Sequence, residues 1–153
     1  MSGGVRVVTL MAALAAATAR PAGAQRFMQP EARVDVLGPG RYAWQPGVGL
    51  TAGLGYYARL TAIAGYAPSP DARMLADHWR GDIIVRVVLD PFREERWGLS
   101  FGGGLSVRRQ TYLAAVVDLE GPSTVGWLPA VEIGVSGGLR AGVVLRRAVK
   151  QRR

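Results

Sequence analysis

The chain has no cysteine and a single histidine, and both shortages restrict its chemistry. Without cysteine the fold has no disulfide, so its stability must come from hydrogen bonds and burial. A metal site would depend on one imidazole and scattered carboxylates, which is a poor ligand set. We therefore expect no metal site and no bound cofactor.

The chain also lacks a hydrophobic run that could cross a membrane as a helix. Its longest apolar or small run, Val7 to Ala19, falls short of the roughly 20 residues that such a helix needs. Arg6 stands in front of this run, and Ala22-Gly23-Ala24 fits a small-residue cleavage site. The sequence therefore predicts a cleaved secretory signal over residues 1–24 rather than a membrane-anchoring helix. No cysteine follows that could carry a lipid anchor.

From residue 26 onward the dominant pattern is an alternation with a period of two, which is typical of a strand whose two faces meet different surroundings. In the clearest stretch Trp97, Leu99 and Phe101 alternate with glycine and serine. Glycine and proline separate the stretches, as at Gly137-Gly138, and no helical period appears. We expect strands over residues 31–36, 47–55, 58–67, 82–90, 97–108, 111–119, 127–137 and 139–145.

These segments predict an all-β fold, an eight-stranded antiparallel up-and-down barrel over residues 25–149 with a basic tail at residues 150–153. Strands of this length suit the roughly 9 to 11 residues that cross a bilayer as a tilted strand. The register is ambiguous over 58–67 and 111–119, because alanine and valine fall on both faces there.

The polar face of the strands carries charges of both signs, although Lys150 is the only lysine of the chain. A water-facing surface usually has abundant lysine and glutamate, whereas glycine with arginine–carboxylate pairs suits a narrow, filled interior. An eight-stranded barrel is just wide enough for its own side chains to fill. We therefore predict an internal charge network rather than a conducting pore, composed of Glu31, Arg33, Asp35, Asp82, Arg86, Asp118, Glu132 and Arg140.

Tyrosine and tryptophan concentrate at both ends of the predicted strands, as in the two interfacial girdles of a membrane barrel. The residues predicted for these girdles are Trp44, Tyr56, Tyr57, Trp79, Trp97 and Trp127. The alternation alone does not say which face points outward. A soluble, lipocalin-like periplasmic barrel that binds an apolar ligand in its lumen is therefore the alternative.

Over residues 26–149 this alternation resembles the small eight-stranded bacterial outer-membrane proteins, such as the transmembrane domain of OmpA. The stretch from Leu89 to Leu99, LDPFREERWGL, is also similar to predicted outer-membrane proteins, which adds a class but no activity. The resemblance implies a location in the outer membrane of a Gram-negative cell, contact with its lipids, and biogenesis through the barrel assembly machinery. We expect a structural or interaction role.

His78, in Asp77-His78-Trp79, is the one residue that suggests catalysis, because outer-membrane lipid acyl hydrolases resemble such small barrels. No nucleophile motif accompanies it, so we expect no enzyme and keep a lipid acyl hydrolase that uses His78 as a further alternative. Gly102-Gly103-Gly104 lacks the Lys-Ser/Thr and the helix of a phosphate loop, and is interpreted as strand glycines that allow curvature or close aromatic packing.

The chain carries a net charge of +8, and its basic residues form two further groups. Export and the lack of a basic helical face argue against nucleic acid as a partner. The first group is placed near the outer rim, where lipid phosphates could bind it, or where it is simply solvated. The groups are Arg41, Arg73, Arg80, Arg108 and Arg109, and then Arg146, Arg147, Lys150, Arg152 and Arg153.

Overall fold

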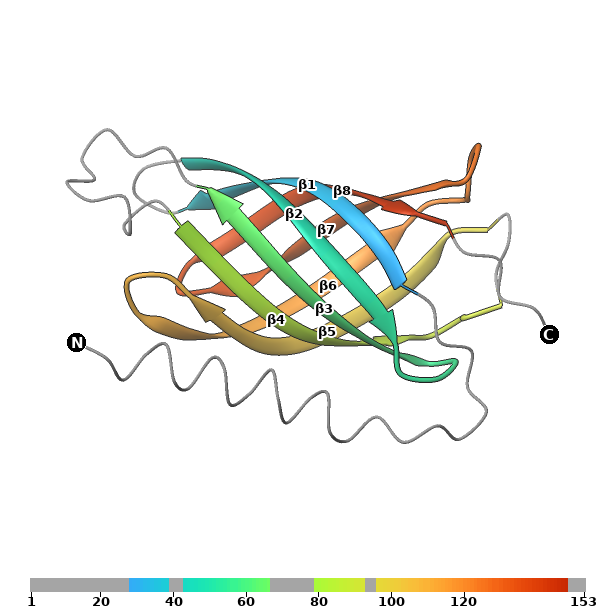
Figure 1. Cartoon of the computed structure of the whole chain (residues 1–153), viewed down its shortest axis with the longest axis horizontal. Coiled ribbons are helices and arrows are strands. Elements are labelled where there is room, and N and C mark those ends of the chain that lie inside the picture. The colour runs from blue at the N-terminus through green and yellow to red at the C-terminus, as the bar shows by residue number, and fades with distance from the viewer. Residues whose placement is uncertain (1–27, 39–42, 67–78, 93–95, 149–153) are drawn as a thin grey trace.

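The computed structural model describes residues 28–38, 43–66, 79–92 and 96–148. They form eight strands, each antiparallel to the next, and β8 pairs with β1 to close the sheet into an up-and-down barrel (Figure 1). The predicted fold class is therefore confirmed. The strands are β1 (Met28–Gly38), β2 (Ala43–Gly53), β3 (Ala58–Tyr66), β4 (Trp79–Val88), β5 (Gly98–Val107), β6 (Thr111–Glu120), β7 (Trp127–Ser136) and β8 (Leu139–Arg147).

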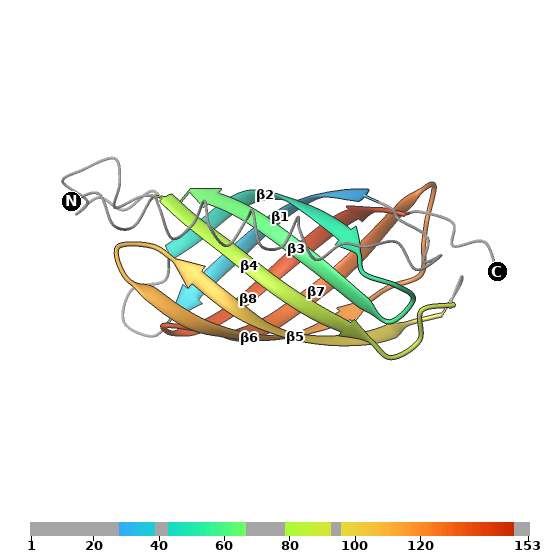
Figure 2. The ribbon, with the colours of Figure 1, turned by 60° about the horizontal axis from the view of Figure 1, so that its bottom comes forward.

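The two ends of the barrel differ in what they carry. The end at which β1 begins and β8 stops, here called the terminal end, also carries the turns between β2 and β3, β4 and β5, and β6 and β7. The opposite end carries the other four connections, and the strands run obliquely between the two ends (Figure 2). The described residues contain no helix long and apolar enough to cross a bilayer.

Several expectations fall on residues that the structure does not describe. They are the secretory signal over residues 1–24, the basic tail at residues 150–153, and the candidate residues Arg41, Arg73 and His78.

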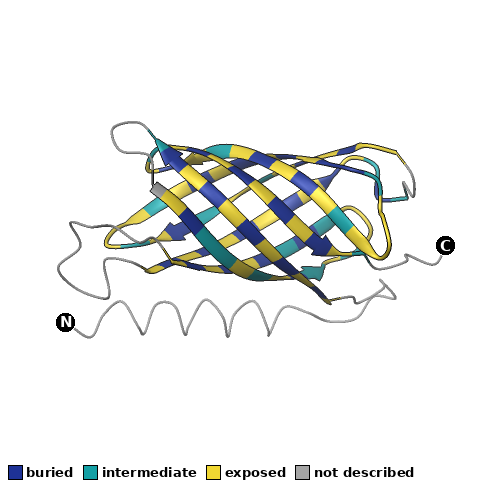
Figure 3. Ribbon diagram, turned by 90° about the horizontal axis from the view of Figure 1, so that it is seen from above, coloured by how far each residue is buried: buried dark blue, intermediate teal, exposed yellow. Residues whose placement is uncertain are grey.

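The apolar face of the barrel points outward. Buried and exposed residues alternate along the strands, and Figure 3 shows the alternation as bands of two colours. Phe101 is 47% exposed and Ile133 57%, whereas Arg86 and Glu132 are 1% and 0% exposed. The polar face therefore lines the lumen, and the question that the alternation left open is answered.

The exterior of the eight strands is almost free of charge. In the strand residues that the structure describes, every Asp and Glu lies on the inward face, and only Arg147, at the last position of β8, puts a charge outside. The outward positions hold valine, leucine, isoleucine, alanine and aromatic residues instead. An uncharged apolar surface therefore surrounds the barrel along nearly its whole length.

Candidate functional site: the charged lumen

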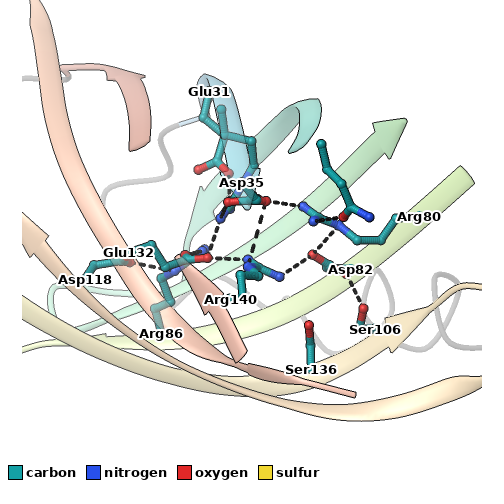
Figure 4. A network of polar contacts seen from close by, with 12 residues as sticks. Glu31, Asp35, Arg80, Asp82, Arg86, Ser106, Asp118, Glu132, Ser136 and Arg140 are labelled. Atoms are coloured by element: carbon teal, nitrogen blue, oxygen red, sulfur yellow. Dashed lines mark hydrogen bonds and ion pairs between the residues drawn. The ribbon is translucent and has the colours of Figure 1, made fainter. Parts of the chain in front are cut away.

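Glu132, on β7, lies at the centre of an ion-pair network inside the barrel. Its carboxylate contacts the guanidinium groups of Arg33, Arg86 and Arg140, which come from β1, β4 and β8. The distance from Arg86 Nη2 to Glu132 Oε2 is 2.6 Å. One buried carboxylate thus joins four strands across the lumen (Figure 4).

Two aspartates extend the network toward the opposite end. Asp35 accepts two hydrogen bonds from Arg33, at 2.9 and 3.0 Å, and a third from Arg80. Asp82 lies 3.1 Å from Arg80 Nε and 2.8 Å from Arg140 Nη1, and it accepts a 2.7 Å hydrogen bond from Ser106. Arg80 and Arg140 each contact both aspartates, so this part of the lumen is continuous with the centre.

Arg146 organises the terminal end of the network. Its guanidinium lies 2.9 Å from Glu31, 3.2 Å from Asp118 and 2.9 Å from Glu120. Arg59, on β3, adds a 3.1 Å ion pair to Glu120. Asp118 also pairs with Arg86 at 2.9 Å, which connects this end to the central carboxylate.

Within the described lumen the buried charges balance. Six arginines and six carboxylates are each at most 7% exposed. Burying a charge is costly unless it is paired, and here every one of these groups contacts at least one opposite charge. The twelve residues are Glu31, Arg33, Asp35, Arg59, Arg80, Asp82, Arg86, Asp118, Glu120, Glu132, Arg140 and Arg146.

The structure brings together all eight residues predicted for the charge network, and it adds Arg59, Arg80, Glu120 and Arg146. Arg80 lies near the opposite end of the barrel, but the expected exposure of Arg80 and of Arg146, in the second basic group, to lipid phosphates or solvent was wrong, because both side chains turn inward and form ion pairs. The sequence does predict this inward orientation, because Arg80 is two residues from Asp82 and Arg146 is six residues from Arg140. Residues an even number apart lie on the same face of a strand.

Glycines opposite the charged residues make room for the long side chains. Gly49 pairs with Glu31, and Gly102 pairs with Arg86. A Cβ atom at Gly49 would lie 2.8 Å from Glu31 Cγ, and one at Gly102 would lie 2.8 Å from Arg86 Cγ. Gly102 therefore allows close packing against a charged side chain, whereas the sequence had suggested curvature or packing against an aromatic ring.

The predicted aromatic residues lie at the two ends of the barrel, and all are at least 40% exposed. Trp44 and Trp79 lie at the opposite end, where Trp79 contacts Tyr66 with the ring centroids 5.8 Å apart. The other four predicted residues, Tyr56, Tyr57, Trp97 and Trp127, lie at the terminal end.

Among the described residues, no group of three or more His, Asp or Glu side chains is arranged to hold a metal ion. Comparison with known proteins found no matching family model, no matching curated protein and no matching solved structure. The candidate site therefore stands on its own geometry.

Proposed function

We propose that the chain, after export through a cleaved signal, is a non-enzymatic outer-membrane β-barrel protein with a structural or interaction role and a lumen filled by its own side chains. The observation that carries the proposal is the uncharged apolar exterior around a closed barrel whose interior holds the ion pairs. A soluble barrel of this size has the reverse arrangement, with large apolar groups inside and charges outside.

Two further features support a membrane location. The strands have 9 to 11 residues, which matches the length of a tilted strand that crosses a bilayer. Exposed tryptophan and tyrosine side chains lie at both ends of the barrel, where amphipathic rings favour the interface between lipid and water. Lipids of the outer membrane and, during biogenesis, the barrel assembly machinery are the partners that this location entails.

The outer face also offers a surface suited to acyl chains. An open groove of about 760 Å³ is lined largely by outward-facing residues of β1 and β5 to β8, among them Phe101, Ile133 and Leu139. Ala115 and Ala141 also line the groove, and their short side chains fill less space than those of the larger lining residues. Acyl chains would make only dispersion contacts there, which is what a lipid-facing surface requires.

The filled lumen supports a structural role over transport or ligand binding. The ion pairs occupy the barrel's centre, so a solute would have to break several buried charge contacts to pass. An apolar ligand, as in the lipocalin-like alternative, would need apolar lumen walls where the structure places arginines and carboxylates.

Membrane fractionation of cells that express the full chain tests the proposal. We expect the mature protein in the outer-membrane fraction, soluble only with detergent, and with a mobility in gels that changes on heating. A protein that stays soluble without detergent and remains monomeric would refute the membrane assignment.

A further inference from the structure

One arginine at the opposite end of the lumen differs from the six that are paired. Arg108 lies directly after β5 and is half-buried. Its Nη2 donates a 3.2 Å hydrogen bond to the hydroxyl of Ser136, while its buried Nε has no hydrogen-bond partner. No carboxylate of the described residues forms an ion pair with it. Arg108 is therefore a cation with one neutral partner.

The strand register places a second arginine beside it. Gly81 and Val107 form the last pair of this register, Arg80 and Arg108 are the next residues beyond it on the two chain segments, and the charge of Arg80 acts on Arg108. Like charges that face each other across two strands repel. Arg80 has its own partners, namely Asp35, Asp82 and Gln45.

The surroundings of Arg108 disfavour its charge. Burial lowers the pKa of the Arg108 guanidinium from its ordinary value, and the charges of Arg80 and Arg140 lower it further, while Asp82 partly compensates. Asp82 lies 3.1 Å from Arg80 and 2.8 Å from Arg140, so its single negative charge faces these two arginines as well as Arg108. The site thus has positive charge without a matching counter-charge.

A count of the charged groups in the lumen also shows an unmatched positive charge at Arg108. The six buried arginines of the described lumen are matched by six carboxylates, and Arg108 is the seventh guanidinium. The surplus of one positive charge lies at the opposite end, within reach of solution because Arg108 is only half-buried. An unpaired, partly desolvated cation gains from an anion, and the planar guanidinium fork fits an oxyanion with two hydrogen bonds.

We propose that the opposite end of the lumen holds an oxyanion-binding site in which Arg108 binds a phosphate group and Ser136 holds the Arg108 guanidinium in position. Ser136 is fully buried and its Oγ accepts the Arg108 hydrogen bond, so it positions the guanidinium while the half-buried Arg108 faces the anion. The phosphate group belongs either to a free ion or to the headgroup of a lipid. The site goes beyond the structural role proposed above.

Calorimetric titration of inorganic phosphate into the purified mature protein, in a zwitterionic detergent at constant ionic strength, tests the site. The matched pair of variants is Arg108→Gln and Arg109→Gln. Arg109 is the exposed neighbour of Arg108, so its substitution removes the same charge without touching the site. We expect saturable binding by the wild type and by R109Q, and a loss of about tenfold or more in R108Q, the scale of one charge-assisted hydrogen bond. S136A should weaken binding less than R108Q does.

A second arm replaces inorganic phosphate with a short-chain phosphatidic acid, and uses short-chain phosphatidylcholine as the reference lipid. Binding that depends on Arg108 only for phosphatidic acid assigns the site to a lipid headgroup, and dependence for both probes assigns it to the phosphate group itself. Equal binding by the wild type, R108Q and R109Q, or no saturable binding of either probe, would overturn the proposal.

Two controls separate folding from binding. Heat-dependent gel mobility reports whether R108Q is folded, and R108K, which keeps the charge but loses the planar fork, serves if R108Q is not. We expect R108K to bind between the wild type and R108Q. The titrations are made in detergent, so a negative result would refute the anion site without bearing on the membrane location. A protein found in the soluble fraction would refute the membrane location without bearing on the anion site.

Discussion

Long charged side chains fit inside so narrow a barrel because the positions beside them have no side chain. Gly142, on β8, pairs with Asp35 on one side and with Glu132 on the other. A Cβ atom added there would overlap Asp35 Oδ1, an atom that Arg33 already holds at 2.9 Å. The absence of a side chain at Gly142 is thus a condition for the ion pairs around it.

We expect Gly142→Ala to destabilise the barrel by about 1–3 kcal/mol, because Asp35 must move away from Arg33 to admit the methyl group. Gly81→Ala is the matched control, since a Cβ atom at Gly81 meets nothing within 4 Å, and it should change stability by no more than about 0.5 kcal/mol. Equilibrium urea unfolding of the two variants in detergent measures the difference. Equal stabilities would contradict this packing role of Gly142.

Glu132→Gln should cost at least about 3 kcal/mol, because the change leaves Arg33, Arg86 and Arg140 without their shared carboxylate. Ser100→Ala removes only one 3.2 Å hydrogen bond, to Asp118, and should cost about 1 kcal/mol. The same unfolding experiment compares them. A Glu132→Gln variant as stable as Ser100→Ala would show that the central carboxylate is dispensable.

At the residue scale, alternation was sufficient within the predicted strand bounds wherever the two faces differed clearly in polarity. It assigned Asp82 and Arg140 to the charge network, yet it missed Arg80 and Arg146. Those two lie beyond the predicted strand ends, at 82 and 145, whereas β4 begins at Trp79 and β8 continues to Arg147. Arg59 was missed for another reason, because the apolar side chain of Ile63 shares the inward face of β3 with Arg59 and obscures the polar alternation of this strand.

The strand ends themselves depend on pairing between strands. Trp79 extends β4 because it pairs with Tyr66 of β3, and Arg147 extends β8 because it pairs with Trp127 of β7. Such partners are distant in the sequence, so a local pattern of alternation does not contain them. Turn residues predicted the strand ends better than alternation did. The turn predicted at Gly137-Gly138 lies between β7 and β8, and Gly137 has a φ of 72°.

Among the described residues, the turn between β6 and β7 contains the one residue other than glycine with a positive φ. Val125 has φ of 51°, Gly126 follows with 79°, and Thr124 and Trp127 pair on either side. A β-branched residue in the left-handed region is strained, whereas asparagine followed by glycine is the preferred pair for such a turn. Val125 is 93% exposed, so no packing contact compensates for the strain.

Val125→Asn should therefore stabilise the hairpin, by about 0.5–1 kcal/mol. Gly126→Ala should have the opposite sign, because it places a side chain at a residue with φ of 79°. Thermal or urea unfolding of both variants against the wild type gives the two signs. Destabilisation by Val125→Asn would mean that the valine side chain makes a contact of its own.

At the scale of the whole molecule, the arrangement of polarity is the reverse of that of a soluble protein. If lipid surrounds the exterior, Val131→Arg, near the middle of β7, should cost about 2–4 kcal/mol in vesicles. Val125→Arg introduces the same charge at the exposed turn and should cost much less. Refolding into phosphatidylcholine vesicles followed by urea unfolding compares them, and equal effects would argue against a bilayer around the strands.

The filled lumen leads to an expectation for ion conduction. Protein inserted into a planar bilayer should carry no large, steady current, because the buried ion pairs occupy the path between the two ends. An open porin inserted in the same bilayer is the positive control. Steady conductance of porin size would contradict a closed interior.

The ion pairs also constrain the order in which the barrel assembles. Arg33 and Glu132 are 99 residues apart, Arg59 and Glu120 are 61, and Arg86 and Glu132 are 46. These pairs join strands that become near neighbours only when the sheet curls and β1 meets β8. Until that moment the charges are stable only while hydrated. We therefore expect the closing of the sheet to expel water from these three pairs together, whereas a pair within one strand, such as Arg33 with Asp35, can form earlier.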